Sequence, residues 1–182
     1  GKSGVALYAV GAEAMSARLE AVAISGAEGR ATMVRVPLDP ARRKKLMAIL
    51  EPLFTSPAAT VVSHDIKRDM ILLRREGIDL IAPYFDTSLA HYVLQPEMRH
   101  RLADVAMQVL HYQTADYSDA PASRKAAVSL PDELLTARLC EQADICRRMM
   151  EPLEQLLADN GQLQLLRDVE LPLARVLAEM EW

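Results

Sequence analysis

Cysteine is scarce in this 182-residue sequence, which contains only Cys140 and Cys146. If both lie on one helix, their six-residue offset separates them by about 9 Å along the axis, beyond the reach of a disulfide. We therefore expect two reduced thiols in an intracellular, cytoplasmic protein. Long apolar runs are also absent. No segment approaches the ~20 residues of a membrane span, so we expect no membrane partner.

An excess of positive charge is missing too. The 21 basic and 25 acidic residues give a net charge of -4, so no global positive field attracts a polyanion. The opening Gly1-Lys2-Ser3 lacks the preceding strand and glycines of a phosphate-binding loop. The four histidines are dispersed without the spacing of a zinc site. Composition alone therefore favours neither nucleic-acid binding nor a histidine-bound metal.

The residues that are present suit one folded domain. Hydrophobic residues make up 51% of the chain and charged residues 25%. A chain of this length can bury roughly 70% of its unfolded surface. It starts at Gly1 and not at Met, and residues 176–182 are typical of a helix interrupted in mid-pattern. We therefore expect a piece of a larger protein.

The first third of the chain has the pattern of strands. Alternating, β-rich runs predict three strands, joined by short loops, over Val5–Val10, Leu19–Ser25 and Arg30–Val36. The two glycines between Gly26 and Gly29 favour a tight antiparallel hairpin. An amphipathic helix follows from Pro40, with apolar residues spaced by three and four.

The remainder reads as one βα unit followed by helices. A buried strand at Thr60–Val62 enters a helix from about Asp65 to Glu76, which Gly77 ends as a left-handed cap. Further helices are expected to Leu94, over Leu102–Leu110, from Pro131 to Asp159 with a break or kink at Pro152, and over Leu163–Trp182 with Pro172 inside. The aperiodic stretch Gln113–Ser129 predicts a mobile loop. This order predicts an α/β domain with a mixed sheet.

Several motifs, in this order, resemble the proofreading 3′–5′ exonuclease domain of bacterial DNA polymerase I. The segment Ser63–Asp69 followed by Gly77-Ile78 is similar to the second exonuclease motif. Phe85-Asp86-Thr87 and then Arg99-His100 continue the resemblance. Glu170–Leu177 is similar to the helix that joins this domain to the polymerase domain.

The resemblance implies a ribonuclease-H-like fold of the DnaQ-like exonuclease superfamily, with a five-stranded mixed sheet flanked by helices. It also implies an exonuclease-like domain over residues 1–160 and the start of the linking helix over 161–182. The parent protein would be a DNA-directed DNA polymerase, a nucleotidyltransferase of DNA replication and repair. Its polymerase domain and DNA are the expected partners of this domain.

In that family, an activated water cleaves the phosphodiester beside two divalent cations held by carboxylates. The first strand supplies an Asp and a Glu two residues apart, on one face. Aligning Tyr8–Glu13 with that strand keeps the Glu as Glu13 and puts Gly11 at the Asp position. Asp69 keeps the carboxylate of the second motif.

The third family motif is a Tyr followed four residues later by an Asp on one helix face. The alignment puts Arg138 at the Tyr position and Gln142 at the Asp position. Gln142 offers a neutral amide, and Arg138 brings positive charge to where a cation would sit. Glu141 or Asp144 could replace the third carboxylate if the helix register differs by one or two residues.

We therefore expect a degenerate exonuclease domain without a working catalytic site. Glu13 and Asp69 would form its remnant, and no cofactor is expected unless residual activity uses Mg²⁺ or Mn²⁺. The domain would then have a structural role and contact DNA weakly. The alternatives are a weak metal-dependent exonuclease acting on single-stranded DNA ends through Glu13, Asp69 and a displaced acid, and a stand-alone ribonuclease of the related RNase D group.

Overall fold

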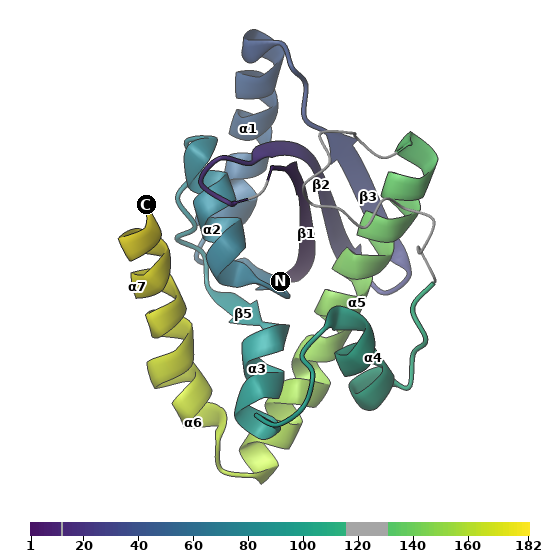
Figure 1. The fold of residues 1–182 in the computed structure, drawn as a ribbon, viewed down its shortest axis with the longest axis vertical. Coiled ribbons are helices and arrows are strands. Elements are labelled where there is room, and N and C mark those ends of the chain that lie inside the picture. The colour runs from purple at the N-terminus through teal and green to yellow at the C-terminus, as the bar shows by residue number, and fades with distance from the viewer. Residues whose placement is uncertain (12, 116–130) are drawn as a thin grey trace.

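The computed structural model describes residues 1–11, 13–115 and 131–182. Its centre is a five-stranded sheet in the order β3-β2-β1-β4-β5 (Figure 1). The strands are β1 (Lys2–Val10), β2 (Arg18–Ala27), β3 (Arg30–Arg35), β4 (Thr60–Ser63) and β5 (Tyr84–Asp86). The first three pair antiparallel, whereas β4 is parallel to β1 and β5 is parallel to β4. The predicted mixed sheet is therefore confirmed.

The predicted hairpin joins β2 and β3. Ala27 pairs with Arg30, and Gly29 lies between them with φ of +68°. Residues with a side chain rarely adopt this backbone conformation. Between β1 and β2 the register shifts after the Tyr8–Ala21 pair, because Ala9 pairs with Leu19 and leaves Glu20 as the extra residue.

The helices follow the predicted order. They are α1 (Pro40–Thr55), α2 (Ile66–Arg75), α3 (Thr87–Leu94), α4 (Leu102–Leu110), α5 (Asp132–Asp159), α6 (Leu163–Leu165), the π-helical turn η1 (Leu166–Glu170) and α7 (Leu171–Glu181). Aspartates Asp39, Asp65 and Asp86 cap α1, α2 and α3 by accepting hydrogen bonds from backbone N–H groups of the first turn. Gly77 follows α2 with φ of +84°, as predicted.

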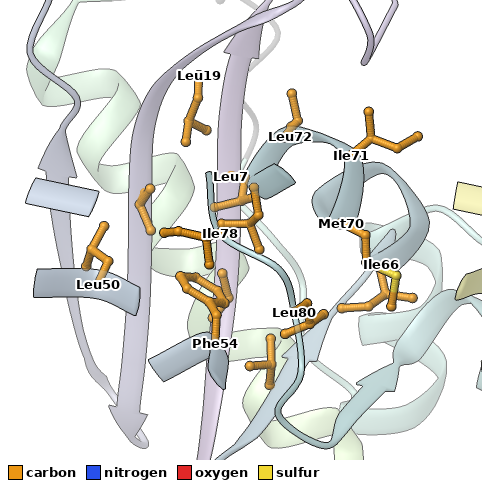
Figure 2. Close-up of a cluster of buried hydrophobic side chains, with 14 of the residues drawn as sticks. Leu7, Leu19, Leu50, Phe54, Ile66, Met70, Ile71, Leu72, Ile78 and Leu80 are labelled. Carbon is orange, nitrogen blue, oxygen red and sulfur yellow. The ribbon is translucent and has the colours of Figure 1, made fainter. Parts of the chain in front are cut away.

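One face of the sheet carries the main apolar core. Val5, Leu7 and Ala9 alternate along β1 and pack against α1, α2 and α7. Figure 2 shows this core, where Phe54 of α1 and Ile66 of α2 gather beneath the sheet with Ile78 and Leu80 of the following loop. These contacts fix α2, and therefore Asp69, relative to β1.

The other face is covered by α5. The alternate β1 residues Ala6 and Tyr8 pack with Ala21 and Ala23 against Leu135, Leu139 and Ala143 of α5. These small side chains allow a close approach between helix and sheet. At Gly4 the approach is closest, because a Cβ there would lie 1.9 Å from the carbonyl oxygen of Ala143.

The break that was one expectation for Pro152 is not seen, whereas Pro172 lies beside an irregular turn. Pro152 does not break α5, which runs unbroken from Asp132 to Asp159, so no separate segment begins there. Pro172 lies just after η1, in which the N–H of Leu171 reaches the carbonyl of Leu166, five residues back. Such a widened turn relieves the clash of a proline ring with the preceding carbonyl.

The C-terminal helices pack on the same body. Leu166 and Leu171 join the core beside α3 and α5, and Ala174 and Ala178 join the core beside α2. Figure 1 shows α7 alongside α2 and β5. The division at residue 160 stays a prediction.

Three further expectations concern particular segments. Cys140 and Cys146 are both free, as predicted, and both lie on α5. The predicted mobile loop lies mostly outside the described residues, which resume at residue 131. In the described part of the chain no helix combines the length and apolarity that crossing a bilayer requires.

Candidate functional site

A cleft of about 860 Å³ opens where β4 ends and α2 begins. Its floor is the middle of β1, residues 5–7. Its walls come from the starts of α2 and α3, one face of α5, the turn that leads into α4, and the first half of α7. The polar side chains on its surface include Asp69 and Lys67 of α2, Arg138 and Gln142 of α5, and His100.

Asp69 is the carboxylate of the cleft that the sequence identified. It lies in the first turn of α2, is 5% exposed, and accepts a short hydrogen bond from the Ser63 hydroxyl at the end of β4. Burial raises the pKa of Asp69 to about 7, against the opposing effects of the Arg68 guanidinium 3.7 Å away and the Ser63 hydrogen bond. A carboxyl in this environment is partly protonated at neutral pH.

A second buried acid, Asp86, holds the scaffold of the cleft together. One of its oxygens accepts from the N–H of Ile66 at 2.7 Å, and the other accepts from Ser88 and Leu89 at 2.8 and 2.9 Å. It therefore ties the starts of α2 and α3 to each other. Burial raises the pKa of Asp86 to about 6, and the three N–H donors oppose that rise.

Histidines form a hydrogen-bonded set beside these acids. Nε2 of buried His91 lies 2.7 Å from Oε1 of Gln108, and an amide oxygen can only accept. Nδ1 of a neutral His91 therefore accepts from Nδ1–H of His100, 2.8 Å away. His64 contacts the hydroxyl of Thr87 and the carbonyl of His100, and desolvation lowers its pKa. These contacts orient His100 on the cleft wall, a role that sequence reasoning missed.

Arg138 and Gln142 both line the cleft from α5, as their four-residue spacing on one helix face requires. Both side chains are half-buried. Neither has a hydrogen-bond or ion-pair partner among residues 1–11, 13–115 and 131–182. The structure brings Asp69, Arg138 and Gln142 to the walls of the same cleft.

The structure does not bring Glu13 or Gly11 to this cleft. Glu13 is exposed beyond the end of β1, where its carbonyl accepts hydrogen bonds from Ser16 and Ala17 at 3.1 and 2.8 Å. Gly11 has φ of +145°, and a Cβ there would lie 2.6 Å from Cα of Ala17. It makes the turn out of the strand. The β1 residues that pack against α5 are Ala6 and Tyr8, and the alignment of Gly11 and Glu13 with the family's first-strand acids stays a prediction.

The two proposed substitute acids are also engaged elsewhere. Asp144 accepts from the Ser25 hydroxyl at 3.1 Å and the Gly29 N–H at 2.9 Å, so it fastens α5 to the β2–β3 hairpin. Glu141 accepts from the Tyr112 hydroxyl at 3.0 Å and the Ala115 N–H at 2.9 Å. Neither acid lines the cleft.

The side chains of the cleft do not fit a pair of divalent cations. Both oxygens of Asp86 are used by backbone donors, burial raises the pKa of the Cys146 thiol, and Arg138 adds positive charge. Within the described ranges, no three His, Cys, Asp or Glu residues are grouped so that they could hold a metal ion. We therefore derive no metal-dependent step from this geometry.

Comparison with known proteins identifies the family to which this domain belongs. The model of a 3′–5′ exonuclease family matches residues 9–138, more than half of the chain. The chain belongs to the 3′–5′ exonuclease domain family of DNA polymerase I. It is similar to DNA polymerase I of Streptococcus pneumoniae, with 34% identity over 140 residues, and of Bacillus subtilis, with 38% identity over 119 residues.

These alignments cover 75% and 64% of this exonuclease domain but only 16% and 13% of the two polymerases. A solved structure is also matched over a small part of its length. It is the POL domain of Pol1 from M. smegmatis in complex with DNA primer-template and dNTP, with 28% identity and a TM-score of 0.76. It is matched by 99% of this chain over 28% of its own length. The chain therefore corresponds to a small part of each relative.

Other solved structures share the fold alone. Brucella melitensis NrnC has a TM-score of 0.78 at 20% identity, with 100% of this chain and 86% of that chain covered. Escherichia coli RNase D has a TM-score of 0.75 at 15% identity, with 97% and 44% covered. These likenesses support the ribonuclease-H-like architecture expected from the sequence.

Proposed function

We propose that this exonuclease domain has lost hydrolytic activity and serves as a structural domain of a cytoplasmic DNA polymerase I in DNA replication and repair. One observation carries the proposal: the cleft presents Arg138 and Gln142 where the family places metal-directed side chains. On this reading, the polymerase domain of the same protein is its principal partner, and any contact with DNA contributes to holding the strand and not to cutting it.

The ligand count supports the proposal. The family needs two acids on the first strand, one in the second motif and one on the long helix. Of the positions aligned with these acids, Gly11 and Glu13 lie outside the cleft and Gln142 carries a neutral amide, so Asp69 is the one aligned carboxylate that lines it. Removing three negative ligands from two divalent ions costs several kcal/mol at any plausible local dielectric, so the pair of ions would not bind.

A nuclease assay tests this directly. A single strand labelled at its 5′ end is incubated with the domain in Mg²⁺ or Mn²⁺, beside an active exonuclease as positive control. We expect the strand to keep its full length, because no pair of metal ions activates water. Metal-dependent shortening from the 3′ end would overturn the proposal.

A weak metal-dependent exonuclease is the second candidate, and it is favoured by one observation: Asp69 does lie in the cleft, with Asp65 and Glu170 on the same surface. This candidate requires Asp69→Ala to abolish whatever shortening the wild-type domain produces. Shortening that persists in Asp69→Ala would instead identify a contaminating nuclease.

A further inference from the structure

We propose that the cleft binds a phosphate group through Arg138 without a divalent metal. The inference rests on the proposed function, because a cleft that held two cations would exclude the guanidinium from this position. The shared chemistry is a phosphate anion, which a free mononucleotide or the end of a single strand could supply.

Arg138 is the basic side chain of the cleft that has no ion-pair partner among the described residues. Its side chain is half-buried on α5 and has no ion-pair or hydrogen-bond partner among the residues that the structure describes. Its fixed charge and planar donors match the oxygens of a phosphate in a bidentate arrangement. Gln142, one helical turn further along the same face, adds amide donors that are equally unengaged in the described ranges.

The other basic groups around the cleft are already engaged. Lys67 pairs with Glu181 of α7 at 2.7 Å, and Arg101 pairs with Asp104 at 2.7 Å. Arg68 lies 3.7 Å from Asp69. They make the rim of the cleft basic, but Arg138 alone is left to neutralise a ligand.

Three of the acids that line the cleft are held by hydrogen-bond donors of the protein. The oxygens of Asp86 accept from three backbone N–H groups, and Asp65 accepts from the N–H of Arg68 at 3.2 Å. The Asp69 carboxyl is held by the Ser63 hydroxyl. Each of these three carboxyl groups therefore has a donor of its own and does not need Arg138, whereas Glu170 at the start of α7 is the acid of the cleft without a donor in the described ranges.

Binding is measured on the whole chain by titration calorimetry in excess EDTA with three probes: inorganic phosphate, deoxythymidine monophosphate and a short oligo(dT) strand. We expect saturable binding of the monophosphate, weakened by Arg138→Gln on the order of 10-fold or more, as for other hydrogen bonds to charged groups. Arg42→Gln, which removes an exposed guanidinium from α1, is the matched control and should bind as wild type.

The probes separate the sources of the phosphate. Strand binding that exceeds monophosphate binding and depends on Arg138 indicates a strand end, and equal binding indicates a free nucleotide; either supports the proposal. No binding to any probe in EDTA, or equal weakening by both variants, would overturn it. Because these titrations contain EDTA, they are read independently of the nuclease assay, and the thermal midpoint of Arg138→Gln verifies that the variant is folded.

Discussion

Asp69 shows how the surroundings of a single carboxyl group set its affinity for a proton. It lies in the cleft in the first turn of α2, where the family has its second-motif acid, yet the surrounding side chains leave it buried and hydrogen-bonded to Ser63. A carboxylate between cations is held ionised, whereas one desolvated without them favours the proton.

The raised pKa of Asp69 predicts how stability depends on pH. Because its pKa of about 7 in the folded chain exceeds the ordinary value of 3.8, the native state binds a proton that the unfolded state releases between those values. The free energy of unfolding therefore falls as pH rises from about 4 to about 7, by as much as about 4 kcal/mol. Asp69→Asn, which stays neutral, should remove this part of the fall.

Urea unfolding in EDTA at pH 5 and at pH 8 measures the effect. Asp86, whose pKa is also raised, is present in both proteins, so its contribution to the pH dependence of stability is common to wild type and variant. An Asp69→Asn variant that loses as much stability as wild type between the two pH values would contradict the assignment of a raised pKa to Asp69.

At the scale of elements, the contact between β1 and α5 positions the residues of α5 that line the cleft. Ala6, Ala21 and Ala23 let the helix lie close to the sheet, and Gly4 leaves no room for a side chain. This close packing sets the depth at which Arg138 and Gln142 sit.

Gly4→Ala should therefore destabilise the domain by about 1 to 3 kcal/mol, because its methyl group would overlap the Ala143 carbonyl and α5 must shift. Gly26→Ala is the matched control: a Cβ there meets nothing within 4 Å, and its φ is not in the left-handed region. Chemical denaturation of the two variants checks this. Equal stability for the two would show that α5 is not held against β1 as described.

The elements also show what the sequence could and could not predict. Helix registers were predictable, because Asp65 fixes the start of α2 and the four-residue spacing of Arg138 and Gln142 puts both on one face. Asp144, two residues past Gln142, is turned by about 200° and meets the hairpin instead.

The register of β1 was not predictable, for a physical reason. In a strand, a slip of one residue exchanges the two faces, so register depends on anchoring side chains. Here the α5-facing positions hold Ala6 and Tyr8, neither of which signals a metal site. The sequence alignment placed the family's first-strand Glu at Glu13, which lies in the turn after β1. Pairing with β2, including the extra Glu20, is visible only in three dimensions.

At the scale of the whole molecule, the C-terminal helices belong to the folded body. Leu166 is fully buried beside α3 and α5, and the Tyr84 hydroxyl donates to the carbonyl of Leu171 at 3.0 Å. The C-terminal helices are thus part of this core.

Leu166→Ala should cost about 2 to 5 kcal/mol, because it leaves a cavity in this core. Its neighbour Leu165, which is 45% exposed, supplies the control Leu165→Ala, for which we expect a change within about 0.5 kcal/mol. Thermal unfolding of both variants measures the difference. A small, equal effect would mean that residues 163–181 do not share the core of the domain.

The π-helical turn before Pro172 sets which side of the last helix faces inward. The additional residue in that turn rotates everything beyond it by about 100° relative to a regular helix. In this orientation of α7, Ala174 and Ala178 lie in the core. Deleting one residue from 166–170 would shorten the chain by little, but it would turn a different face of α7 toward α2.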